Sequence, residues 1–330
     1  MSNENLPLEG GSLIDAIREF NLPNLIAGPA GKAISRLIAG AADIPAAFLE
    51  GISQGIRDKK EAKTLISKEL AKAVAENAKL DIETVNRAAV RWLGDEVRKQ
   101  VNREEVARKT IDYLKDSPVE ESTPVVDDDF MDSFSSYAEK ANSEKMRDLW
   151  ARVLKGEIRK PGSYSLATLR FMAELDIETA NAVQEIFIGV FRGGAIFWQE
   201  DFNKSPKLTS VTLLEQRGLL SGVGGMRSTY PEIESNGYLI LPFRKKGLVL
   251  TGKPSTKIGI TSLLLSRMGV EVMSLLDLED DLEIAQRMLP ELTLDGVDKI
   301  EWCDCLFEND RLQALQGGTT IWERPQVNLG

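Results

Sequence analysis

The chain has 330 residues, enough for two domains with separate cores, and its 42% hydrophobic and 28% charged residues are typical of a folded soluble protein. It contains no histidine, which excludes Ser-His-Asp and Cys-His nucleophilic sites and zinc sites with histidine ligands. The net charge of −10 is uneven, because residues 271–330 hold 14 acidic and 4 basic residues whereas residues 204–270 hold 3 acidic and 10 basic residues.

Residues 1–56 predict an N-terminal apolar helical segment. They lack the basic start and apolar centre of a secretory signal, and no apolar run in the chain reaches the roughly 18 residues that cross a bilayer; we therefore expect a cytoplasmic protein. Pro29 and Pro45 divide the Ala-, Gly- and Ile-rich stretch 25–56, which favours a buried helical hairpin. The alternative is peripheral contact with a membrane or a partner, for which the candidate residues are Ile34, Leu37, Ile38, Phe48 and Leu49.

Residues 57–195 predict a helical bundle domain. Up to about Asp116 the sequence is highly charged, with apolar residues at helical spacing, which predicts two long helices that pack on the rest of the domain. Val97 and Val101 are expected to continue the buried stripe of Val85, Ala89 and Trp92. Self-association through one of these helices is the alternative.

Four helix starts follow a proline-containing loop. Asp128 or Asp129, Ser143, Ser165 and Asp176 each precede a helical pattern, as N-cap residues do. The short turns between these helices predict antiparallel neighbours in a bundle.

The segment 127–182 contains three distinctive sequence motifs. It contains the acidic start Asp127-Asp128-Asp129-Phe130, the run LWARVLKGEI and the run KPGSYSLATL, and the stretch RAAVRWLGDEVRKQVNREEVARKTIDYL precedes it at 87–114. From roughly 45 to 190 the chain resembles a bacterial domain-of-unknown-function family related to the abortive-infection alpha proteins. The resemblance implies a role in defence against phage, with a second defence protein or a further copy of the chain as partner. It supplies no catalytic residues.

Residues 204–290 predict a small winged-helix-like α+β domain, and residues 291–330 an acidic C-terminal extension. A helix at 208–220 is followed by a Gly-rich loop, the strand-like runs GYLILPF and KGLVLTG, and a helix in LLLSRMGVEVMSLLD. This order of elements is usual in winged-helix domains. The fold class expected for the whole chain is therefore mainly α.

The basic residues of this domain are candidate contacts for nucleic acid or phosphate. The alternatives are a module that binds only protein and an ordinary solvated hairpin. If the basic surface does bind, a further hypothesis is that the acidic extension shields it until a partner displaces the extension. The candidates are Arg217, Arg244, Lys245, Lys246, Lys253 and Lys257.

The string Asp128-Asp129-Phe130-Met131-Asp132 matches the short D-D-x-x-D pattern that binds magnesium in isoprenoid synthases. Acidic residues at a helix start are more simply explained by capping and by the helix dipole. We therefore expect no metal site, no cofactor and no catalytic site. The favoured function is a sensor, adaptor or effector in phage defence that acts through self-assembly or partner binding. A nucleic-acid-binding regulator and a membrane-perturbing effector led by residues 25–56 are the alternatives.

Overall fold

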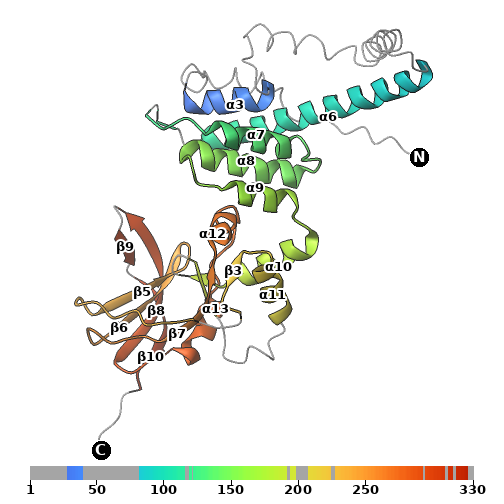
Figure 1. Cartoon of the computed structure of the whole chain (residues 1–330). Coiled ribbons are helices and arrows are strands. Elements are labelled where there is room, and N and C mark those ends of the chain that lie inside the picture. The colour runs from blue at the N-terminus through green and yellow to red at the C-terminus, as the bar shows by residue number, and fades with distance from the viewer. Residues whose placement is uncertain are drawn as a thin grey trace, which may run out of the picture. The chain divides into compact units, whose positions relative to one another are not determined.

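The computed structural model describes residues 28–39, 82–115, 119–120, 122–191, 194–197, 207–223, 227–292, 294–308, 311–314 and 317–325. The chain divides into two compact units, Met1–Ala173 and Glu174–Gly330. Among the described residues the first unit is helical, and the second combines helices with two antiparallel sheets (Figure 1). The protein is therefore a mixed α/β protein with substantial helix. The division falls at Ala173, inside the segment 57–195 that the sequence predicts as a helical bundle domain.

The described helices of the first unit are α3 (Pro29–Ala39), α6 (Ile82–Lys115), α7 (Asp128–Ala138), α8 (Glu144–Arg159) and α9 (Leu166–Ala173). Among them, α3, α7 and α8 pack against the long helix α6, and α9 packs against α7. Asp127 caps α7 by accepting from the Phe130 amide, and Ser143 caps α8 by accepting from the Met146 amide. Trp150 on α8 is 1% exposed and lies edge-on to Phe134 of α7, with ring centroids 5.5 Å apart.

A buried carboxylate holds the turn between α8 and α9. Glu157 is 2% exposed and accepts hydrogen bonds from the amides of Gly162 at 2.6 Å and Tyr164 at 3.1 Å. Gly162 has φ +85°, a left-handed conformation that suits glycine. A Cβ at Gly156 would lie 2.7 Å from the Tyr164 ring. The runs LKGEI and KPGSYS of the sequence thus form one structural turn.

The second unit contains two sheets in which every pairing is antiparallel. The first has the order β1-β2-β7-β3, with β4 also paired to β7. Its strands are β1 (Val190–Phe191), β2 (Ala195–Phe197), β3 (Leu220–Ser221), β4 (Arg227–Thr229) and β7 (Ile260–Leu265). The second has the order β10-β8-β6-β5, with β9 also paired to β8. Its strands are β5 (Tyr238–Pro242), β6 (Lys246–Gly252), β8 (Val297–Glu308), β9 (Arg311–Ala314) and β10 (Thr319–Glu323).

Short helices complete the second unit. They are α10 (Ile177–Phe187), α11 (Leu208–Gln216), α12 (Arg267–Met273), α13 (Leu282–Met288) and the 3₁₀ turn η2 (Leu289–Glu291). Asp176 caps α10 through the Thr179 amide, and Ser266 caps α12 through the Gly269 amide. Both caps lie where a polar residue precedes an apolar helical pattern in the sequence.

The winged-helix-like arrangement predicted for 204–290 is not confirmed. The hairpin β5–β6 is present, but β6 continues into a sheet by pairing with β8, where Leu248 lies opposite Trp302 and Leu250 opposite Ile300. The expected helix at 263–277 is shorter, because its first residues belong to β7. The acidic segment 291–330 is not an appendage, since it supplies the strand at the centre of the second sheet.

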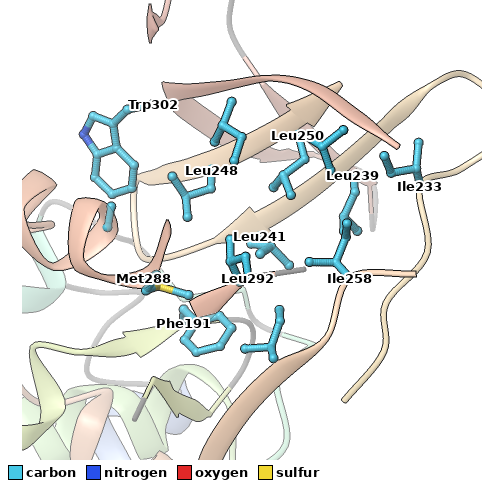
Figure 2. Packing of buried hydrophobic residues seen from close by; sticks show 14 residues of the cluster. Phe191, Ile233, Leu239, Leu241, Leu248, Leu250, Ile258, Met288, Leu292 and Trp302 are labelled. Atoms are coloured by element: carbon cyan, nitrogen blue, oxygen red, sulfur yellow. The ribbon is translucent and has the colours of Figure 1, made fainter. Parts of the chain in front are cut away.

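The core of the second unit lies on this sheet (Figure 2). Leu241, Leu248 and Leu250 project from β5 and β6 with no exposed surface. Met288 of α13 and Phe191 of β1 belong to the same cluster, which also includes Trp302 of β8. Residues separated by more than 100 positions therefore share one core.

Candidate interaction surface

Helix α6 is the element of the first unit that carries the candidate interaction surface. It has 34 residues and runs past the ends of α7 and α8 (Figure 1). Its C-terminal half is held in the core, where Val106, Ala107, Ile111 and Leu114 are at most 2% exposed. Packing in the core therefore explains why the apolar residues occur in this part of the helix.

The N-terminal part of α6, up to Val101, exposes apolar side chains. Val90, Val97 and Val101 are 47%, 49% and 41% exposed, and Gly94 lies between them at the same helical spacing. With 3.6 residues per turn these positions share one side of the helix, turned away from the core residues near Val106. We call this set the outer stripe: Val90, Gly94, Val97 and Val101.

Trp92 lies on another side of the same part of α6. It is 56% exposed, whereas Val85 and Ala89, on the same side by helical spacing, are 7% and 8% exposed. Exposed tryptophan is unusual on a free surface and frequent among residues that dominate protein–protein interfaces. Two sides of α6 therefore present apolar groups.

The outer stripe corrects the sequence-based interpretation of Val97 and Val101. They were expected to continue the buried stripe of Val85 and Ala89, yet both are more than 40% exposed. The physical reason is helical geometry, since an offset of twelve residues from Val85 to Val97 turns the side chain by about a third of a circle. Counting turns along the whole helix would have found this surface.

Ile34, Leu37 and Ile38, predicted as membrane or partner contacts, belong to the core. They are 5%, 0% and 5% exposed, because α3 packs against α6, α7 and α8. Phe48 and Leu49 lie outside the described residues. Within the part of the chain that the structure describes, no helix has the length and hydrophobicity needed to span a bilayer.

Arg36 occupies the place where the D-D-x-x-D string would hold a cation. Its guanidinium pairs with the carboxylates of Asp128 and Asp132, the latter at 2.9 Å. Asp127 is engaged as the cap of α7. The acidic start thus holds α3 to α7, and the described residues contain no group of three or more side chains suited to a metal.

The predicted basic surface of 204–270 is largely neutralised by ion pairs. Nitrogen–oxygen distances are 2.8 Å for Arg217–Asp176, 2.7 Å for Lys246–Asp304 and 3.4 Å for Lys257–Glu232. Asp304 belongs to the acidic C-terminal segment, so one such pair does come from that segment. Lys245 and Lys253 are exposed. The six candidates therefore do not form one open cationic face.

Arg244 and Asp280 fix the turn between β5 and β6. The Asp280 carboxylate accepts from the backbone amides of Arg244, Lys245 and Lys246, at 3.0, 2.6 and 2.8 Å. The Arg244 guanidinium donates to Asp280 at 3.2 Å and to the carbonyl of Phe187 at 2.5 Å. This concave set of amides would suit an anion, and a side chain of the protein itself fills it.

Burial raises the pKa values of two thiols and one phenol. Burial raises the pKa of the Cys303 thiol and raises that of Cys305 to about 11, so neither forms a thiolate near neutral pH. Burial, and then the 2.6 Å hydrogen bond that Tyr113 donates to Asp148, raise the pKa of Tyr113. These groups lack the features of an activated nucleophile.

Residues 86–191 match a family model described as a protein of unknown function, DUF2806. The matched DUF2806 domain begins in α6, includes the outer stripe and extends through α10 to β1. Comparison with curated proteins and with solved structures gives no significant match.

Proposed function

We propose that this protein is a non-catalytic component of a bacterial phage-defence system that acts by binding a partner protein or further copies of itself through α6. The observation that carries the proposal is the exposure of four apolar side chains in the N-terminal part of α6, those of Val90, Trp92, Val97 and Val101. Leaving such side chains in water forgoes about 1.5–3 kcal/mol for each one that an interface could bury. Exposed apolar groups gathered on one element therefore favour a binding surface.

The setting in phage defence rests on the resemblance of residues 127–182 to the relatives of the abortive-infection alpha proteins. The DUF2806 match carries no activity. Assembly, rather than chemistry, is further favoured by a chain without histidine, the commonest general acid and base in enzymes.

The proposal is tested by co-purification of the tagged full chain from its native host, with and without phage. Trp92→Ala and Val97→Asp remove or charge the two apolar sides of α6. We expect the wild-type chain to recover a discrete protein, or further copies of itself, and at least one of the two variants to recover roughly tenfold less. The same variant is expected to reduce protection in a plaque assay.

Ile177→Asp is the matched control, because Ile177 is 81% exposed and lies on α10 of the second unit. It places the same charge on the surface without touching α6. Equal recovery and equal protection with all four proteins would exclude α6 as the functional surface.

A further inference from the structure

We infer that α6 binds α6 of a second copy of this chain, with the two helices antiparallel. The inference deepens the proposed function and rests on it, since it names the occupant of the outer stripe. In the register that the sequence favours, Val90 faces Val101 of the second copy and Gly94 faces Val97 of the second copy. The same contacts occur twice, as two-fold symmetry requires.

The outer stripe is the centre of a longer seam with the spacing of paired helices. Steps of four and three residues alternate along it, which is the repeat that keeps one line of side chains facing a partner helix. Its eight positions are Glu83, Arg87, Val90, Gly94, Val97, Val101, Glu104 and Arg108. The outermost N-terminal pair is open to solvent, with the side chains of Glu83 and Arg87 81% and 68% exposed.

Charge selects the antiparallel orientation. In that register Arg87 faces Glu104 of the second copy, and Glu83 faces Arg108 of the second copy. We call each pair of facing residues a layer. Since each pair occurs twice, the dimer has four apolar layers at its centre and four layers of opposite charge, two at each end. In a parallel pair every residue would face its own copy, and the same four positions would each bring like charges together.

The local contacts of α6 are compatible with this pairing. Arg87 lies 3.6 Å from Glu83, and Arg108 lies 2.9 Å from Glu105 and 3.3 Å from Asp112. A guanidinium has five N–H donors, so each can bind one further carboxylate. Glu104 accepts from Gln100 at 2.9 Å, and a carboxylate has further lone pairs for a second donor. Gly94 has no side chain and so lets the helices approach closely opposite Val97. Arg98 flanks the seam, and it donates within its own chain to Asp95 at 3.3 Å and to Asn142 at 2.7 Å.

A charge-exchange series tests the inference on the full chain by sedimentation velocity over a wide concentration range. The wild-type protein is expected to reach twice the 36.5 kDa mass of one chain. Arg87→Glu and Glu104→Arg alone each place like charges in two layers, and each is expected to raise the dimer dissociation constant at least tenfold. The double variant Arg87→Glu/Glu104→Arg restores opposite charges and is expected to return to within threefold of wild type.

Lys145→Glu is the control, a charge reversal at an exposed position of α8 that is away from the seam. Circular dichroism of each variant checks that the chain is folded. A wild-type chain that stays monomeric, a double variant no better than the single ones, or a Val97→Asp variant that dimerises like wild type would each overturn the inference.

Failure of this inference and failure of the proposed function give different results. A monomeric chain that still loses a co-purified protein on Trp92→Ala leaves the proposed function standing without the dimer. A dimer that dissociates on Val97→Asp while plaque protection is unchanged supports the pairing and removes its role in defence.

Discussion

The carboxylate of Asp280 lies 3.2 Å from the guanidinium of Arg244 and also accepts hydrogen bonds from three successive backbone amides, beginning with that of Arg244. The Asp280 side chain is 4% exposed and that of Arg244 is 19% exposed. The pair joins the β5–β6 turn to the end of α10, whose terminal carbonyls also accept from Arg244. Its role is therefore structural, although the sequence presents Arg244 as part of a basic patch.

Replacement of Asp280 by alanine is expected to lower the free energy of unfolding by about 3 kcal/mol, because it leaves a half-buried guanidinium and three amides without their acceptor. Urea denaturation measures the change. Glu279→Ala is the control, since Glu279 is an exposed neighbour. A loss no greater than that of the control would show that solvent replaces Asp280 at little cost.

Glu157→Ala is expected to lower the free energy of unfolding by about 2 kcal/mol, because the amides of Gly162 and Tyr164 lose a buried acceptor. Glu157→Gln keeps one carbonyl oxygen and is expected to lose less. Thermal unfolding of the two variants beside wild type checks the order. An equal loss in both would mean that the charge of Glu157, rather than its acceptor geometry, stabilises the turn.

Gly269→Ala is expected to destabilise the protein by about 3 kcal/mol through overpacking, because the new Cβ would lie 2.0 Å from the carbonyl oxygen of Leu219. At Gly189 the nearest atom to an added Cβ is 3.5 Å away, so Gly189→Ala serves as a control with little expected loss. Urea denaturation compares them. Similar midpoints for the two variants would mean that α12 moves away from Leu219 freely.

Asp176 is expected to make stability depend on acid pH. Its pKa is lowered from the usual 3.8, first by the hydrogen bond from the Thr179 amide and further by Arg217. Because the folded pKa is the lower one, the contribution is complete above about pH 5 and is lost as the pH falls through 3.8 and then through the folded value. Asp176→Asn keeps a capping oxygen but removes this charge.

The measurement is the difference in unfolding free energy between wild type and Asp176→Asn at a series of pH values. We expect it to favour wild type at pH 7 and to shrink as the pH falls through 3.8 and then through the lower folded pKa of Asp176. Asp277→Asn, at an exposed position, is the control. A difference that stays constant with pH would contradict the assignment of the lowered pKa to the cap.

Local signals in the sequence predicted local structure well. Ser143 and Asp176 each begin a helix with the expected cap, because the capping oxygen and the amide it binds are three residues apart in the chain. The cap of α7 is Asp127, one residue before the predicted Asp128 or Asp129. The pairing of β6 with β8 was missed, since Leu250 and Ile300 are 50 residues apart and no short-range pattern specifies their register. For the same reason the pairing of Arg244 with Asp280, 36 residues away, could not be predicted from the sequence.

The candidate surface was only partly predictable. The sequence predicted a long charged helix that could self-associate. It also placed Val85 and Val97 on one buried face, although the two residues lie on different sides of the helix. Exposure of Val97 depends on where α6 enters the core, which is after Val101 and is decided by the packing of α3, α7 and α8.

The position of β8 at the centre of the second sheet has a consequence for synthesis of the chain. The hairpin β5–β6 leaves the ribosome about 50 residues before the strand that covers its open edge, since Val249 pairs with Glu301. Until then β6 has an edge of unpaired backbone groups and its leucine side chains are exposed, so the partly synthesised chain is prone to aggregate. The second unit therefore completes its fold only after β8 has been synthesised, and chains that stop before residue 297 are expected to need chaperones or to be degraded.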